Sequence, residues 1–247
     1  MEEIDSLQIN LNSNFASKYI NDSHCNCVFD LPNVLIPNQH HVHISVVNAI
    51  IPYSFYNINL SNNILIYIVN GSSYTLNIPI GNYNSIQLAT YLTQNMPNME
   101  CTYNIIPNTF TFTHSDQDFI LIGISSCLKS MGFENTNTSS VSHTLSSSFC
   151  ANLQSVQCVH IKSNFITGNI NSSNIYVQDT LCSIPVNSPP NTNIVYNNTN
   201  NFTSNMYSNI LNDIVIKIVS QDNVILDLNG LDWSITLQLD IVDFVND

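Results

Sequence analysis

In residues 228 to 242, LNGLDWSITLQLDIV, polar and apolar side chains alternate strictly from Asp232 to Ile241. One parity consists of Trp233, Ile235, Leu237, Leu239 and Ile241, and it includes the only tryptophan of the chain. Because successive side chains of a strand point to opposite faces, this period predicts a strand with one face in a core. Asn229 and Gly230 tolerate positive φ, which predicts a tight turn and a closing hairpin with the preceding VILDL.

Strand-like segments of the same kind occur on both sides of the middle of the chain. Three of them are HHVHISVVNAIIP (40–52), SVQCVHIKSNF (155–165) and DIVIKIVSQD (213–222). About seven or eight strands are expected outside the middle region, a number that suits an all-β jelly roll or a similar sandwich. We expect strands from both ends of the chain to fold into a single sandwich, with Trp233 in its core.

The middle of the chain has a different pattern. NILIYIVNGSSYTLNIPI (63–80) predicts a hairpin, and GNYNSIQLATYLTQNM (81–96) predicts a helix capped by Asn84 or Ser85 and ended by Pro97. We therefore expect a β-β-α-β-β subdomain at 63–133, inserted between jelly-roll parts at 1–62 and 134–247. The polar stretch at 134–148 is expected to be a surface loop.

Charge excludes one class of partner. Only 9% of the residues are charged, against roughly 25% in an average globular domain. The chain has four Lys and Arg residues in total and a net charge of −13, so we expect no direct binding to nucleic acid. Polarity comes instead from Asn, Ser and Thr. Either an AT-rich genome explains the many Asn residues, or loops such as 197–205 expose neutral hydrogen-bonding groups for assembly; composition does not separate these interpretations.

The chain offers no export or membrane signal. It begins with the acidic MEEIDS, and no apolar stretch approaches the roughly 20 residues of a membrane span. We expect a soluble protein made in the cytosol, without a transmembrane segment. Seven cysteines, an odd number, are then expected to be free thiols and mostly buried; they are Cys25, Cys27, Cys101, Cys127, Cys150, Cys158 and Cys182.

Candidate metal and redox sites are few. His41 and His43 would share one face of a strand next to His40, with His160 or Asp240 as further ligands brought in by folding. The alternative is a polar outward face that titrates with pH. Cys25 and Cys27 do not have the C-x-x-C spacing of redox or zinc motifs, so we interpret them as neighbouring thiols on one face of a strand. We expect neither a metal nor another cofactor.

Catalytic motifs such as G-x-S-x-G and H-E-x-x-H do not occur. Carboxylates gather near the ends of the chain, where a pair could act in glycoside hydrolysis or simply keep a strand soluble. These residues are Glu2, Glu3, Asp5, Asp227, Asp232, Asp240, Asp243 and Asp247. No catalytic residue can be assigned, and we expect no enzymatic activity.

Three stretches together carry a resemblance to a known family. They are NAIIPYSFYNI (48–58), YTLNIPIGNYNSIQLATYL (74–92) with CLKSMGF (127–133), and the terminal VILDLNGLDWSITLQLDIV. They resemble the penton, or minor capsid, proteins of polinton-like viruses and virophages. The resemblance runs from about residue 48 to the C-terminus, and the closing segment with Trp233 is its most specific part.

This resemblance implies a single jelly-roll subunit in the virion. Five copies would form a homopentamer at an icosahedral vertex, beside a double-jelly-roll major capsid protein, and the insert would face outward. We further expect the acidic residues 1–12 to reach an adjacent capsomer without contributing to folding. The alternative function is a carbohydrate- or receptor-binding β-sandwich module, for which Tyr53, Phe55 and Tyr56 are the candidate aromatics.

Overall fold

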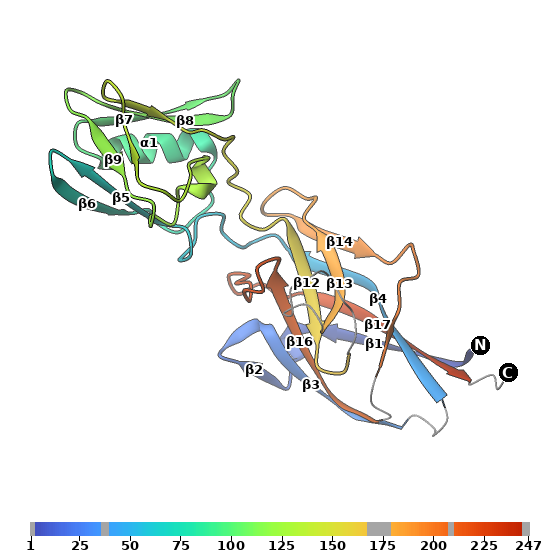
Figure 1. Ribbon diagram of the computed structural model, residues 1–247. Coiled ribbons are helices and arrows are strands. Elements are labelled where there is room, and N and C mark those ends of the chain that lie inside the picture. Colours follow the sequence, from blue (N-terminus) through green and yellow to red (C-terminus); the bar gives the residue numbers. More distant parts are fainter. Residues whose placement is uncertain (1–2, 36–39, 167–178, 207–209, 244–247) are drawn as a thin grey trace. The chain divides into compact units, whose positions relative to one another are not determined.

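The computed structural model describes residues 3–35, 40–166, 179–206 and 210–243 (Figure 1). The chain divides into two compact units, one made of residues 1–55 with 156–247 and the other of residues 56–155. In the described residues, no helix is long and apolar enough to cross a membrane. Residues from both ends of the chain belong to the first unit.

The first unit is a jelly roll of two antiparallel sheets. One sheet has the order β1 (Glu3–Asn12), β17 (Ser234–Asp243), β4 (His40–Pro52), β14 (Asn193–Asn197), and the short β15 (Ser204–Asn205) also pairs with β4. The other has the order β13 (Thr180–Pro185), β12 (Cys158–Ser163), β16 (Ile210–Ser220), β3 (Ser23–Leu35), β2 (Lys18–Ile20). Two five-stranded antiparallel sheets, in which many neighbouring strands are far apart in sequence, are the arrangement of a jelly roll.

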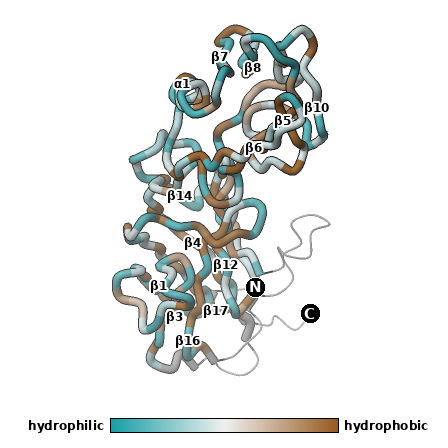
Figure 2. Tube along the Cα trace, turned by 90° about the vertical axis from the view of Figure 1, so that its left-hand side faces the viewer, coloured by the Kyte–Doolittle hydropathy of each residue, from teal (hydrophilic) through white to brown (hydrophobic). Residues whose placement is uncertain are grey.

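The core of the jelly roll lies between these sheets and confirms the predicted alternation. Ile235, Leu237 and Leu239 of β17 are buried, and Trp233, just before the strand, is 1% exposed. The alternation ends at Ile241, which is only partly buried, whereas the next residue, Val242, is buried. The indole packs edge-on against the ring of Phe29, with the ring centroids 5.8 Å apart. Hydrophobic colour follows β4, β12 and β17 in Figure 2, in keeping with a core drawn from both sheets.

The expected closing hairpin is wrong. Asn229 and Gly230 do adopt positive φ, 52° and 78°. However, β16 pairs with β12 and β3, whereas β17 pairs with β1 and β4. β3 pairs with one edge of β16 from Ile210 to Lys217, and β12 pairs with the other from Ile216 to Ser220. The chain folds back on β16 only at its end, where Val219 pairs with Ile225, and it then crosses to the other sheet.

The second unit has its own two sheets, helix and core. β5 (Ile64–Val69), β6 (Ser72–Asn77), β9 (Phe119–Leu121) and β10 (Thr138–Ser139) form one sheet, and β7 (Met99–Asn104), β8 (Thr109–His114) and β11 (Thr144–Ser146) form the other. Helix α1 (Ser85–Asn95) begins with the predicted cap, because Asn84 and Gln87 make a reciprocal capping box. Gly132, in the left-handed region, ends the short 3-10 helix η2 (Lys129–Met131) as expected.

This unit extends beyond the expected range 63–133 on both sides. The stretch at 134–148 is not simply a surface loop, because β10 pairs with β9 and β11 pairs with β8. Buried Ser140 and Ser147 accept hydrogen bonds from the N–H groups of Phe119 and Phe110, at 2.9 and 3.2 Å. Serine hydroxyls thus join these strands to the sheets, a role that hydrophobic periodicity does not reveal.

The expectation for residues 1–12 is also wrong. Residues 3–12 form β1, whose Leu7, Ile9 and Leu11 stand opposite Leu239, Leu237 and Ile235 of β17. Leu11 is 3% exposed. The segment is an edge strand of the jelly roll and contributes to its core, so it is not a free tether.

Deleting residues 1–12 is therefore expected to destabilise the jelly roll. The deletion uncovers one edge of β17 and removes Leu11, whose burial alone contributes about 1.5–3 kcal/mol. Thermal unfolding followed by circular dichroism should show a clearly lower melting temperature or no folded protein. Asn10→Ala, which removes only an exposed hydrogen bond to Thr236, is the control and should change stability by less than about 0.5 kcal/mol. Unchanged melting of the truncated chain would contradict this assignment.

Candidate functional site

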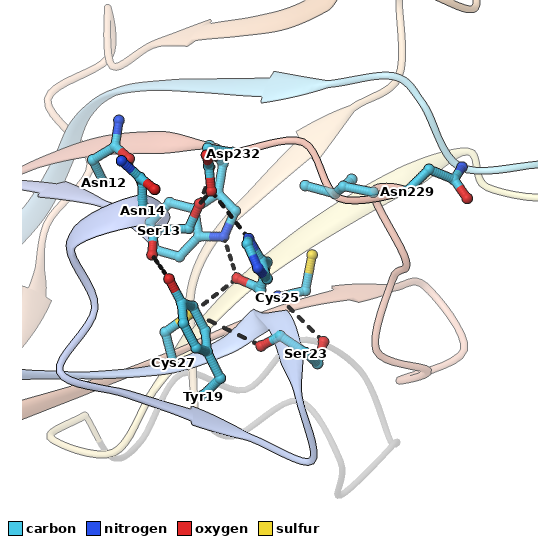
Figure 3. A network of polar contacts seen from close by, with 12 residues as sticks. Asn12, Ser13, Asn14, Tyr19, Ser23, Cys25, Cys27, Asn229 and Asp232 are labelled. Carbon is cyan, nitrogen blue, oxygen red and sulfur yellow. Dashed lines mark hydrogen bonds and ion pairs between the residues drawn. The ribbon is translucent and has the colours of Figure 1, made fainter.

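The most connected polar site of the jelly roll surrounds Asp232 (Figure 3). Its Oδ1 accepts a hydrogen bond of 2.7 Å from the Ser13 hydroxyl and lies 3.0 Å from Nδ1 of His24. Ser13 belongs to the 3-10 helix η1 (Ser13–Phe15), His24 to β3, and Asp232 to the crossover before β17. One carboxylate therefore joins three segments that are distant in sequence.

The same site holds Trp233 in place. The backbone N–H of Trp233 donates to Ser13 Oγ at 3.1 Å, and its indole N–H donates to the carbonyl of His24 at 2.7 Å. Tyr19 stacks on His24 with ring centroids 4.6 Å apart, and its hydroxyl donates to the Ser13 carbonyl at 2.8 Å. The polar atoms of the buried tryptophan are thus satisfied, as a buried indole requires.

Ser13, His24 and Asp232 have the residue types of a hydrolytic triad but not its geometry. In a triad the serine bonds to the histidine, and the carboxylate orients that histidine from the other side. Here Ser13 donates to Asp232 directly, and its side chain is fully buried. A buried hydroxyl bonded to a carboxylate cannot attack a substrate, so the arrangement serves to hold the fold together.

Hydrogen bonding stabilises the ionised form of Asp232. The Ser13 hydroxyl, followed by the hydrogen bond and charge of His24, lowers the pKa of this carboxyl below its ordinary value. These groups therefore favour the ionised form of Asp232 in the folded protein. Sequence reasoning placed Asp232 among the carboxylates that keep a strand soluble and missed this role, because Ser13 is 219 positions away.

The histidines proposed as metal ligands do not come together in the described residues. The side chains of His40 and His41 lie outside the described part. His43 stands opposite Asp240, whose Oδ1 accepts from Ser6 at 2.9 Å. His160 is on the other sheet, bonded to Ser183 at 2.7 Å. No group of three or more His, Cys, Asp or Glu side chains suited to a metal ion occurs within the described ranges.

The seven cysteines are free. Cys25 and Cys27 are buried, and the thiol of Cys27 donates to the carbonyl of His24 at 2.8 Å. Burial raises the pKa of Cys27 to about 11, and it raises that of Cys25 as well. Both thiols are therefore protonated at neutral pH, which disfavours metal binding and thiolate chemistry.

Two of the three aromatics considered for a sugar platform are in the core. Tyr53 and Phe55 are 6% and 4% exposed and stack with ring centroids 4.4 Å apart. Tyr56, which is partly exposed, belongs to the other compact unit. A sugar-stacking surface needs exposed rings, and these two rings do not provide one.

Asp232→Ala is expected to lower the free energy of unfolding by about 1–3 kcal/mol, because the buried Ser13 hydroxyl loses its acceptor. Urea denaturation checks this value. Asp222→Ala is the matched control. Asp222 lies in the same crossover, but its side chain is exposed and bonds its neighbour Gln221. The free energy of unfolding of this variant should change by less than about 0.5 kcal/mol. Equal effects of the two variants would contradict the role given to Asp232.

The lowered pKa of Asp232 also predicts a pH dependence. A carboxyl with a lower pKa in the folded state stabilises the fold above its unfolded pKa of about 3.9, and this contribution disappears as the pH falls through the folded value. The stability difference between the wild type and Asp232→Asn should thus be largest above about pH 5 and shrink toward pH 3. Urea midpoints across this range test the prediction, and a difference that grows on acidification would refute it.

Comparisons with known proteins place the fold. No protein-family model matches the chain, and neither does any curated protein. Among solved structures, the mavirus penton protein matches with a TM-score of 0.53 and 9% identity, over 97% of this chain and all of the penton protein. The Sputnik virophage structure matches with a TM-score of 0.45 and 11% identity, over 98% of each chain. The chain therefore has the fold of the mavirus penton protein, from its first strand to its last.

Proposed function

We propose that the chain is a structural capsid protein, the penton or minor capsid subunit at the vertices of an icosahedral virion. The match with the mavirus penton protein carries this proposal, because it spans both compact units and leaves no part of that protein unmatched. A jelly roll alone would not distinguish capsid proteins from lectins and other jelly-roll proteins. A match that spans a jelly roll together with a second compact unit is more specific.

A ring of five copies needs contacts between two different surfaces of the subunit. The jelly roll offers such surfaces, since β1 and β14 are opposite edges of one sheet, and β13 and β2 are opposite edges of the other. Its few charged residues also favour close approach of identical, acidic copies, because like charges facing each other would oppose assembly. These properties support a homopentamer that contacts a double-jelly-roll major capsid protein.

The proposal includes no catalysis. The Ser13–Asp232–His24 cluster supports folding rather than hydrolysis, and the carboxylates Asp227 and Asp240 bond a turn amide and a neighbouring hydroxyl. The protein would be made in the host cytoplasm and reside in the virion, with the second unit facing outward as an appendage. The alternative of a carbohydrate-binding module is not favoured, because Tyr53 and Phe55 are buried.

Electron imaging of particles assembled from this chain and its major capsid protein tests the proposal. We expect density for the jelly roll at every fivefold vertex, and native mass spectrometry of released vertices should give five times the subunit mass of 27.6 kDa. Particles with this chain at other positions, or none of it, would overturn the assignment.

A surface variant tests the ring contact itself. Val195 of edge strand β14 faces Ile50 of β4, and both are exposed, at 53% and 41%. An exposed apolar pair beside an open edge is a candidate subunit contact, so Val195→Asp should abolish incorporation at vertices while leaving the melting temperature of the subunit nearly unchanged. Asn152→Asp adds the same charge in the other unit and should assemble normally. Normal assembly of the Val195 variant would exclude this contact.

A further inference from the structure

The second unit exposes apolar side chains where its helix meets an edge strand. Ile105 and Ile106, in the turn from β7 to β8, are 72% and 98% exposed, and Ile86 of α1 is 58% exposed. Single exposed apolar side chains are common on protein surfaces. Three exposed isoleucines in one place form an apolar patch, and such patches often mark binding sites. A shallow groove runs between α1 and β7, and Ile86 and Ile105 are part of its lining.

The floor of this groove is the open edge of a sheet. The sheet order is β11, β8, β7, so β7 has no strand on its outer side. At Cys101 the helix closes this edge: the Cys101 N–H donates to Thr93 Oγ1 at 2.9 Å, and the same hydroxyl lies 3.0 Å from the Cys101 carbonyl. One side chain thus occupies both backbone groups of Cys101.

The edge is open two residues further on, at Tyr103. Phe110 of β8 stands opposite Tyr103. Its N–H donates to Ser147 Oγ, and its C=O accepts from the Ser147 N–H, so both groups point away from β7. In an antiparallel ladder, the N–H and C=O of Tyr103 then point away from β8, in the same direction as those of Cys101. One helical turn before Thr93 stands Ala89, which has no hydroxyl to bond them. The groove therefore presents unpaired main-chain groups between apolar walls.

The charge of the groove indicates what it would hold. Among its lining residues, all of them described, Glu100 carries the only charge. The whole unit from residue 56 to 155 has only five Asp, Glu, Lys and Arg residues, so few other charges compete with Glu100 for a cationic group. A complementary occupant has a cationic side chain near Glu100 and an apolar one near Ile86 and Ile105.

We propose that the groove between α1 and β7 binds an extended segment of a partner protein, which adds a strand to the outer edge of β7. Its backbone pairs with Tyr103, its alternate apolar side chains pack on Ile86 and Ile105, and a Lys or Arg lies beside Glu100. Strand addition to an open edge is a general mode of peptide recognition, with affinity from the main chain and specificity from alternate side chains. The inference rests on the second unit alone and is independent of the proposed capsid role.

Fluorescence polarisation with the full chain tests this proposal. The probe is a labelled heptapeptide KTVTVTV, and ETVTVTV is its charge-reversed partner. Tyr103→Pro removes the outward N–H, which an edge strand tolerates, whereas Tyr103→Ala removes the same side chain and keeps the N–H. We expect the lysine peptide to bind and Tyr103→Pro to weaken it by at least about tenfold relative to Tyr103→Ala, as expected for one lost hydrogen bond with added steric exclusion.

Glu100→Lys provides the second arm. It should reverse the preference, so that the glutamate peptide binds more tightly than the lysine peptide. Melting curves must show that Tyr103→Pro and Tyr103→Ala are folded to the same extent; if they are not, Ile105→Ser replaces the pair and should weaken binding in the same way. No binding of the lysine peptide by the wild type, equal binding by the compared variants, or a preference that Glu100→Lys leaves unchanged would each overturn the proposal. So would a self-association of the chain that Tyr103→Pro abolishes, because the occupant would then be a second copy.

Discussion

The jelly roll depends on the packing of one face of β17 against the opposite sheet. β17 pairs with β1 on one side and with β4 on the other, so residues from both ends of the chain meet along it. Because the side-chain period is two, a slip of one residue would turn Ile235, Leu237 and Leu239 to solvent, which fixes the register. Contacts between residues so far apart in sequence form slowly, because the chain loses conformational entropy on loop closure before burial of apolar side chains compensates for it.

Local patterns predicted the elements of the fold but not all of their partners. The sequence predicts the strand of β17, the helix cap at Asn84 and the positive φ of Asn229 and Gly230, because each depends on a few neighbouring residues. Whether that turn leads to a hairpin or to a crossover depends on β1 and β4, between which β17 pairs in the opposite sheet. That pairing with distant strands leaves no trace in the turn itself.

The site around Asp232 was less predictable for the same reason. Its partners Ser13 and His24 are separated from it by 219 and 208 positions, and none of the three stands in a recognisable motif. One signal was present: an Asp beside the only Trp, whose indole N–H needs a partner when buried. Conversely, only their residue type suggested that His43 and His160 could share a metal ion. They lie on β4 and β12, in different sheets, and alternation places both on outward faces.

The 9% identity with the mavirus penton protein shows which information specifies this fold. Identical residues are too few to specify it, in keeping with the general rule that apolar and polar patterning, more than residue identity, determines a fold. Each compact unit encloses a core of its own, one around Trp233 and the other around Phe110 and Phe112. With separate cores, substitutions in one unit need no compensation in the other, because distant sites without shared partners contribute additively to stability. The surface of the inserted unit can therefore change while the jelly roll keeps its own geometry.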